Sequence, residues 1–486
     1  MDLAFEIKKK LDSGKSDLPF KKLYHCNIGN PQKLGQKPLK FNREVLSIVM
    51  NPDLAEIAPK GTFSEAAVTR AKTYLNAIQG GVGAYSQSQG YEIVRKEVSA
   101  FISKRDGFPS NPNNVFLSEG ASSSVRMIYQ TIIADEKDGI MVPIPQYPLY
   151  SALSTLMGAN LVGYYLDETA GWKASMSELI RSYDEAIKNG TRIRALVVIN
   201  PGNPTGQCLS LSAQQDLVRF CVKNKLVLLA DEVYQENVYV NFFFFGSIQQ
   251  QQQQHNYHLK QYLNFRYAKD KSFTSFKKVA LSMGKEMSEL QLVSFHSTSK
   301  GFIGECGLRG GYMELHNIPD DVKAQIKKLA SISLCPNTIG QLCVGLMTNP
   351  PSSGKAGKDY KTQSSETLAS LERRAIKLCK GLNDLEGVTC NRAEGAMYLF
   401  PRIRLPSGVS KAAKEQGLSP DNFYCCEALR HTGIVVVPGS GFKQEPGTFH
   451  FRTTFLPSED DMDSVIASLS SFHASFMKKY SSSSSQ

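Results

Sequence analysis

Four side chains with complementary chemistry occur in order along this chain. Asn203 lies in the glycine- and proline-rich stretch Asn200–Gln207, and Asp231 follows an apolar run. Lys300 ends a Ser-Thr-Ser-Lys motif, and Arg309 follows nine residues later, before two glycines. An amide on a rigid turn, an acid at a strand end, an amine and a phosphate-binding guanidinium are the groups needed to hold pyridoxal 5'-phosphate (PLP) as a lysine imine.

Lys300 is the predicted Schiff-base amine. A lysine must lose its proton to attack a carbonyl carbon, and the freed amine can then act as a general base. Ser297 and Arg309 are both expected to contact the phosphate, Arg309 as a planar fork of donors. A lone lysine or arginine is most often a surface residue. The spacing of these three residues favours the catalytic interpretation.

A second phosphate contact is expected where a strand-like run ends and a helix begins. Gly120 makes the turn, and Ala121 and Ser122 open the helical stretch. The free N–H groups and the positive end of a helix dipole suit a phosphate. We therefore predict Ala121 and Ser122 as cofactor-binding residues. Because many turns in α/β proteins look alike, this prediction depends on the other motifs.

Asp231 is predicted to face the pyridine nitrogen, because a carboxylate there keeps that nitrogen protonated. An aspartate at a strand end could instead cap a helix. Asn203 and Tyr234, which could both bond the phenolic oxygen of PLP, favour the catalytic role for Asp231. Tyr147, in a Pro-Gln-Tyr-Pro motif, could stack on the ring or be an ordinary core tyrosine.

Arg452 lies inside the apolar run 449–454. An arginine in an apolar strand is costly unless its charge is paired. A substrate α-carboxylate bound by two hydrogen bonds would pair it. Arg452 is therefore a predicted substrate-binding residue, and Asn203 is expected to contact the substrate as well.

Composition limits the class of protein. The chain has 486 residues, of which 41% are hydrophobic and 21% charged, as is usual for a soluble enzyme of one large and one small domain. The net charge of +11 is scattered, so we expect no nucleic-acid partner and a field that attracts anionic substrates. No apolar run approaches the roughly 20 residues that span a bilayer, so no membrane partner is expected.

The ten cysteines lack paired Cys-x-x-Cys spacing, so no metal site is predicted. Scattered thiols fit a reducing compartment. The first residues resemble neither a signal peptide nor a transit peptide, and the last residues are not a peroxisomal Ser-Lys-Leu tail. We expect a cytoplasmic protein, with mitochondria and peroxisomes left open as alternatives.

Strand-like and helical patterns alternate in the first two thirds of the chain. Strand-like runs lie at 114–118, 139–143, 195–199 and 226–230, of which the last two are continuously apolar, and helical stretches lie at 121–133 and 213–222. This alternation predicts an α/β fold with a mostly parallel central sheet. Ligands of such sheets bind beyond the carboxyl ends of the strands, where the Gly120 turn and Asp231 are expected.

The pattern changes after about residue 350. A long helical stretch lies at 366–382. Three short strand-like pieces follow it, at 395–400, 434–437 and 448–452. We predict a large PLP-binding domain of residues 51–350 and a smaller α+β domain of residues 1–50 plus 351–486. Six glutamines, 249–254, predict an irregular low-complexity insert at about 241–270.

Together these motifs resemble the class I/II aminotransferases, which are PLP-dependent transferases of fold-type I. The similarity covers about residues 24–480 and is carried by Cys26–Pro38, Gly83–Gly90, Pro143–Ser151, Asn200–Gln207, Ala230–Asn237, Phe295–Gly301, Gly304–Gly311, Gly395–Pro401 and Val437–Phe442. Within that group the match to alanine aminotransferases is close. Glutamate:glyoxylate aminotransferases resemble them throughout and stay an alternative. A catalytically inactive binding protein with the PLP-enzyme fold is a remote alternative.

The resemblance implies a ping-pong reaction of L-alanine and 2-oxoglutarate that gives pyruvate and L-glutamate through a Lys300 Schiff base, with Asp231 and Tyr234 as further catalytic residues. The partners would be small amino and oxo acids and a second copy in a homodimer. Tyr85 matches a tyrosine that reaches the partner subunit's cofactor phosphate, and Gly29 matches a substrate-side turn. The Asn203–Pro204 peptide would be cis. The family usually has a further segment before the position of Met1.

Overall fold

The computed structural model describes residues 2–14, 17–239 and 272–481, so the predicted insert at about 241–270 lies outside the described residues. At its centre lies one sheet of eight strands: Val115–Ser118 (β2), Asp138–Ile144 (β3), Asn160–Asp167 (β4), Lys173–Ala174 (β5), Arg192–Ile199 (β6), Val227–Asp231 (β7), Leu292–Ser297 (β8) and Gly311–His316 (β9). Their order across the sheet is β2-β9-β8-β7-β6-β3-β4-β5.

The sheet is mostly parallel, as the sequence predicts. β3 pairs in parallel with β4 and β6, and β7 pairs in parallel with β6 and β8. β9 runs antiparallel to β2 and β8, and β5 runs antiparallel to β4. The four strand-like runs form β2, β3, β6 and β7 and are largely buried, because helices cover both faces of the sheet.

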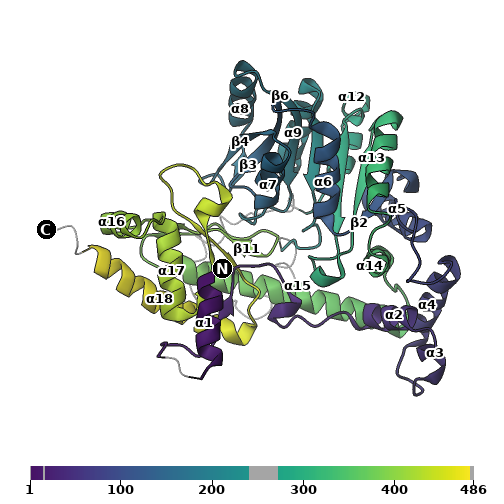
Figure 1. The fold of residues 1–486 in the computed structure, drawn as a ribbon, viewed down its shortest axis with the longest axis horizontal. Helices are drawn as coiled ribbons and strands as arrows, with labels where there is room; N and C mark the ends of the chain where they lie inside the picture. The colour runs from purple at the N-terminus through teal and green to yellow at the C-terminus, as the bar shows by residue number, and fades with distance from the viewer. Residues whose placement is uncertain (1, 15–16, 240–271, 482–486) are drawn as a thin grey trace, which may run out of the picture.

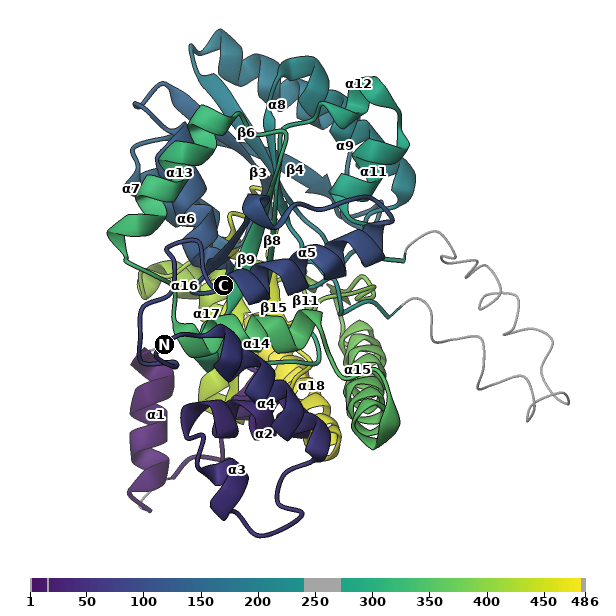
Figure 2. The ribbon, with the colours of Figure 1, turned by 90° about the vertical axis from the view of Figure 1, so that its right-hand side faces the viewer.

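Two layers of helices sandwich the sheet (Figures 1 and 2). One face carries α6 (Ala121–Ile132), α7 (Pro148–Leu156) and α13 (Asp320–Ile332); the other carries α8 (Met176–Lys188), α9 (Leu211–Asn224), α11 (Phe276–Ser282) and α12 (Lys285–Ser288). Each layer buries its own apolar cluster against the strands. The serines that precede α8, α9 and α11 accept a hydrogen bond from the first turn, which fixes where each helix begins.

A third apolar core joins helices from distant parts of the chain. It is built by α2 (Lys40–Met50), α4 (Glu65–Ala77), α5 (Glu92–Asp106) and α14 (Thr338–Thr348), with the short α3 (Leu54–Ile57) beside them. Gly107 ends α5 with a φ of 79°, a left-handed conformation that glycine adopts without strain. This arrangement fixes the end of α5 against the edge of the sheet.

The two ends of the chain meet in the remaining part of the molecule (Figure 1). Its helices are α1 (Asp2–Asp12), α15 (Gly354–Asn383), α16 (Ser407–Glu415), α17 (Pro420–Thr432) and α18 (Glu459–Ser481). Its short strands are β1 (Tyr24–His25), β10 (Val388–Thr389), β11 (Tyr398–Leu399), β12 (Arg402–Ile403), β13 (Ile434–Val435), β14 (Val437–Pro438) and β15 (Phe451–Thr454). β1 pairs with β13, which joins the N-terminal segment to the C-terminal third. The division into domains near residues 50 and 350 stays a prediction.

Two details differ from the sequence-based expectation. The helix expected at 366–382 already begins at Gly354, because Tyr360 in its first turns is buried in the core around α14. The strand expected at 395–400 shrinks to β11, since Ala396 has a φ of 58° that interrupts extended backbone. None of the described helices combines the length and apolar character needed to cross a membrane.

Candidate active site

The predicted site residues gather where the central strands end. Asp231 is the last residue of β7, Ser297 is the last of β8, and Gly120 follows β2 and precedes α6. Lys300 comes three residues after β8. Because parallel strands end at the same edge of the sheet, residues far apart in sequence converge there.

Asp231 is a buried acid with few partners in the chain. Its carboxylate accepts hydrogen bonds from the Tyr150 hydroxyl at 2.7 Å and the Val233 N–H at 3.4 Å. Burial raises the pKa of Asp231, while the bond from Tyr150 lowers it. A turn at 233–236, and no helix, comes after Asp231, so the alternative role as a helix cap has no support in the described residues. Tyr150 is a partner that the sequence did not reveal.

The Lys300 amine is held close to Gly29 and Tyr234. Its Nζ donates to the Gly29 carbonyl oxygen at 2.7 Å and lies 5.8 Å from the centre of the Tyr234 ring. A β-carbon at Gly29 would collide with the Tyr398 hydroxyl and would lie 3.0 Å from Nζ. Glycine at position 29 thus keeps open the space in front of the amine.

Tyr398 is a further group in the site that sequence reasoning missed. The Tyr234 hydroxyl donates to the Tyr398 hydroxyl at 3.1 Å, and both side chains are buried. Burial by itself would raise the pKa of Tyr398, but the positive charges of Lys300 and Arg452 and the bond from Tyr234 lower it overall. Tyr398 lies on β11, in the motif Gly395–Pro401. Its position in this motif is the sequence feature that could have identified Tyr398 as a site residue.

Arg452, on β15, is buried and only partly satisfied by the protein. Its Nη1 donates to Asn203 Oδ1 at 3.1 Å and its Nη2 to the Asn27 carbonyl oxygen at 2.6 Å. The guanidinium carbon lies 4.4 Å and 4.8 Å from the ring centres of Tyr398 and Phe442. The Nε group is buried without a hydrogen-bond partner among the described residues. This geometry leaves donor capacity for an anionic ligand. The Asn203–Pro204 peptide beside it is cis, as expected.

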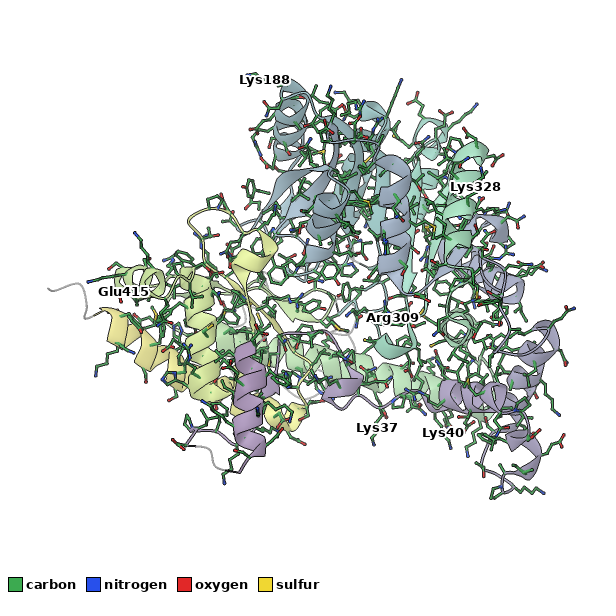
Figure 3. All side chains as sticks on the ribbon, viewed as in Figure 1. Lys37, Lys40, Lys188, Arg309, Lys328 and Glu415 are labelled. Carbon is green, nitrogen blue, oxygen red and sulfur yellow. The ribbon has the colours of Figure 1, made fainter. Side chains whose placement is uncertain are left out.

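The third group of predicted residues surrounds the start of α6. Arg309 donates from Nη2 to the Glu119 carbonyl oxygen at 3.0 Å, and a β-carbon at Gly120 would lie 2.5 Å from the same nitrogen. Ala121 and Ser122 form the first helical turn, and the Ser297 hydroxyl accepts from the Ser299 N–H at 3.4 Å. Figure 3 shows Arg309 between the sheet and the helices beneath it.

Two further predicted residues are Tyr147 and Tyr85. Tyr147 precedes α7, and its ring is 6.4 Å from that of Tyr150 in an edge-on arrangement. Burial, and then the neighbouring Tyr398, raise the pKa of Tyr147. Tyr85 is 77% exposed on this chain, so no site contact within the same chain explains it. Its role toward a partner subunit stays a prediction.

The residues present fit PLP. The amine of Lys300, a buried acid with few partners and a helix start beside an arginine provide the imine-forming, pyridine-binding and phosphate-binding groups. Gly29 and Gly120 leave space where any side chain would collide. Among the described residues, no group of three or more His, Cys, Asp or Glu side chains could hold a metal ion.

Comparison with known proteins decides the family. The model of the family described as aminotransferase class I and II matches residues 53–469. The chain belongs to the class I and II aminotransferases.

Relatives and solved structures agree with this aminotransferase family. The chain is 49% identical to alanine aminotransferase 1, mitochondrial, of Arabidopsis thaliana, over 99% of its own length and 84% of the relative. It is 47% identical to glutamate–glyoxylate aminotransferase 1 of the same plant, over 95% of its own length and 90% of the relative. The structure of alanine aminotransferase from Pyrococcus furiosus is similar with a TM-score of 0.70 at 23% identity, covering 97% of this chain and 95% of that one. That likeness confirms the predicted fold of a fold-type I aminotransferase.

Proposed function

We propose that this aminotransferase converts L-alanine and 2-oxoglutarate to pyruvate and L-glutamate with PLP as its cofactor. The observation that carries the proposal is the arrangement of Lys300, Asp231 and Arg452. An amine, a buried acid and an arginine with an unpartnered donor face one site, at the carboxyl end of the sheet. The identity to alanine aminotransferases over nearly the whole chain supports the choice of substrates.

Each end of the cofactor has a set of residues suited to hold it. Arg309, Ser297 and the start of α6 at Ala121 and Ser122 would hold the phosphate. Asp231 would pair with the pyridine nitrogen, and its burial makes a positively charged partner there favourable. Tyr234 and Asn203 would bond the phenolic oxygen, and Tyr147 would cover the ring. When bound, PLP supplies an electron sink for the charge left on the substrate carbon after proton loss.

The protein's own groups bind the substrate and move its proton. Arg452 would bind the α-carboxylate of the amino or oxo acid, and the two flanking rings hold its guanidinium in place. The Lys300 amine would take the Cα proton as a base and then give it up to the cofactor as an acid. The Gly29 carbonyl orients that amine in the resting protein, and the turn around Gly29 would line the substrate side.

We further propose that the protein acts as a homodimer with Tyr85 of each chain reaching the other subunit's phosphate site. The high exposure of Tyr85 on the single chain is consistent with this. Cross-linking and analytical ultracentrifugation would measure the assembly. A monomer with full activity would contradict it.

The cellular compartment is part of the same proposal. We expect the cytoplasm, with mitochondria and peroxisomes as the alternatives; the Arabidopsis relative carries the word mitochondrial in its name. Imaging of the tagged full chain would decide between them.

Glutamate:glyoxylate transamination is the second candidate, because a relative of that name is 47% identical over 95% of the chain. The two reactions need the same catalytic residues and differ only in the acceptor. The deciding experiment measures kcat/KM of the purified protein for pyruvate and for glyoxylate as acceptors with L-glutamate as donor. A higher value for glyoxylate would replace the proposed function. A protein that binds PLP but transfers no amino group would support the inactive PLP-fold alternative.

A further inference from the structure

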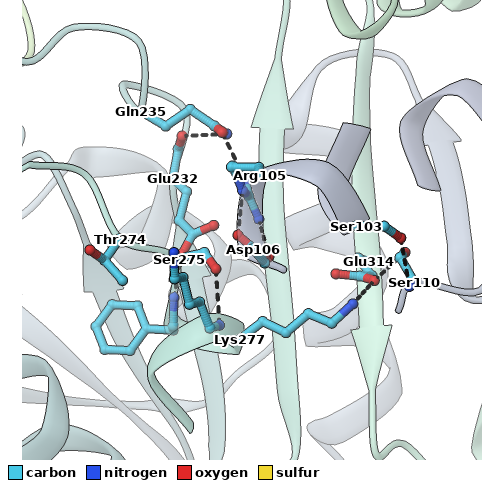
Figure 4. Close-up of polar contacts among 12 residues, drawn as sticks. Ser103, Arg105, Asp106, Ser110, Glu232, Gln235, Thr274, Ser275, Lys277 and Glu314 are labelled. Atoms are coloured by element: carbon cyan, nitrogen blue, oxygen red, sulfur yellow. Dashed lines mark hydrogen bonds and ion pairs between the residues drawn. The ribbon is translucent and has the colours of Figure 1, made fainter. Parts of the chain in front are cut away.

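A cluster of charged side chains lies around the end of β7, contributed also by β9, α11 and the end of α5 (Figure 4). Glu232 directly follows β7, Glu314 lies on β9, and Lys277 comes from α11. Arg105 and Asp106 reach the cluster from the end of α5. All five side chains are buried or nearly so. Glu232 lies next to Asp231 in the motif Ala230–Asn237, but none of the five residues is itself assigned to PLP or substrate.

Arg105 is the centre of this cluster. Its Nε and Nη2 donate to the two carboxylate oxygens of Asp106 at 2.7 and 2.8 Å. Its remaining nitrogen, Nη1, donates to Gln235 Oε1 at 2.8 Å. Each nitrogen of the guanidinium therefore has a partner, and the fork geometry fixes Gln235 relative to the end of α5.

Gln235 lies in the turn that carries two proposed cofactor contacts. Its backbone N–H and its side-chain amide donate to the Glu232 carbonyl oxygen at 3.0 and 3.3 Å. Asp231 comes just before this turn, and Tyr234 lies within it. Two residues further on, Asn237 Oδ1 accepts from the N–H of Gly301, the residue after Lys300, at 2.8 Å. The turn thus touches Arg105 on one side and the Lys300 loop on the other.

We propose that Arg105 is a positioning residue: through Gln235 it fixes the turn after β7 and so holds Asp231 and Tyr234 in place for the cofactor. This inference rests on the proposed function. Buried polar groups that are fully paired hold one geometry, and small displacements of catalytic groups are costly. Removing the Arg105–Gln235 bond should therefore weaken PLP binding and turnover more than the loss of an equally buried hydrogen bond elsewhere.

The test compares two variants of the full chain. Gln235→Leu removes the acceptor for Arg105 without changing charge and leaves the Arg105–Asp106 pair intact. Tyr424→Phe is the matched control, because it removes the buried 2.9 Å bond between the Tyr424 hydroxyl and His473 Nδ1, and neither residue is assigned to PLP or substrate. We measure the melting temperature of both apoproteins, the PLP dissociation constant by fluorescence titration, and kcat and KM for L-alanine.

We expect similar losses in melting temperature for the two variants. Only Gln235→Leu should raise the PLP dissociation constant and lower kcat, each by about tenfold, with the KM for alanine within about twofold of wild type. Equal PLP affinity and kcat in the two variants would overturn the positioning role. A wild-type protein that fails to bind PLP or to transfer the amino group of alanine would overturn the proposed function instead, before any variant is compared.

Discussion

Two arginines, the buried Arg452 and the largely buried Arg105, have their hydrogen-bond donors satisfied in different ways. Arg105 donates from each of its three nitrogens to side chains of this protein. Arg452 uses two nitrogens for Asn203 and Asn27 and leaves Nε buried without a partner in the described residues. Its guanidinium also lies between two aromatic rings rather than beside a carboxylate.

The difference separates groups that serve the fold from groups that await a ligand. A buried charge that lacks an opposite charge is costly until something binds it, whereas a paired one mainly fixes geometry. Asp231 and Glu232 repeat the contrast in adjacent residues. Asp231 faces the site with Tyr150 as its side-chain partner, while Glu232 accepts from the Phe276 N–H at 2.9 Å behind the sheet.

Changes on the ligand side should have the largest effects on activity. Lys300→Ala removes the proposed base, so we expect turnover of L-alanine to fall by at least about 10²–10⁴-fold. Lys328→Ala, at an exposed position on α13 (Figure 3), is the control and should leave turnover unchanged. A steady-state assay of both variants checks this, and near-normal turnover in Lys300→Ala would remove the central residue from the mechanism.

Arg452→Gln tests the arginine that has an unpartnered hydrogen-bond donor. Loss of a buried carboxylate partner costs about 2–5 kcal/mol, so kcat/KM for both L-alanine and 2-oxoglutarate should drop at least about thirtyfold. Arg430→Gln changes an arginine that pairs with Glu427 on α17, away from the site, and should stay near wild type. If only one of the two substrates were affected, Arg452 would not bind the carboxylate that they share.

Arg105→Met tests the arginine whose three nitrogens all have hydrogen-bond partners, and its main effect should be on the stability of the fold. Removing one partner of a buried pair leaves Asp106 uncompensated, and we expect the free energy of unfolding of the apoprotein to fall by about 3 kcal/mol. Urea unfolding measures it. Lys8→Ala, which breaks an exposed ion pair with Asp12 on α1, should not change stability measurably. A stability loss no larger than that of the control would mean that the cluster contributes nothing to the fold.

The pH dependence of stability sharpens the contrast at Glu232. Burial raises the pKa of this carboxyl from 4.5 to about 7. The folded state then holds its proton more tightly than the unfolded chain, so this group lowers stability progressively as pH rises from about 4.5 to 7. Glu232→Gln cannot lose a proton. The free energy of unfolding of this variant, relative to that of wild type, should therefore rise by on the order of 2 kcal/mol from pH 5 to pH 8.

Thermal melts at the two pH values test this expectation for Glu232. Glu415→Gln, at an exposed position on α16 (Figure 3), should show the same difference from wild type at both pH values. A pH-independent difference between Glu232→Gln and wild type would show that Glu232 keeps its ordinary pKa.

The smallest effect is expected from replacing residues 240–271 by a flexible linker of about ten Gly and Ser residues. The residues on both sides are anchored independently. Tyr239 donates from its hydroxyl to the Ala396 carbonyl oxygen, and Ser275 caps α11. PLP affinity and alanine turnover should stay within about twofold of wild type, because no proposed contact lies in the replaced stretch. A larger loss would assign that stretch a part in the site.

The sequence predicted the residues of the site better than their partners. Asp231, Lys300 and Arg309 belong to contiguous motifs, and strand ends of a parallel sheet are known to converge, so their meeting could be foreseen. Tyr398 and Tyr150 bond residues 164 and 81 positions away, and no local pattern announces such contacts. The Arg105 cluster was missed for the same reason.

Strands β2, β3, β6 and β7 were predicted from local runs of residues, which depend little on distant contacts, whereas their order in the sheet was not predicted. The start of α15 could not be predicted, because the burial of Tyr360 against remote helices decides it.

The contact between Arg452 and the Asn27 carbonyl joins positions 425 residues apart. During synthesis the carboxylate-binding end of the site cannot exist until almost the whole polypeptide has left the ribosome. Strand β7 with Asp231, and Lys300 just after β8, emerge earlier. An incomplete chain is therefore expected to capture the vitamin-derived cofactor, if at all, before it can recognise an amino acid, and a chain that ends short of β15 should never acquire that recognition.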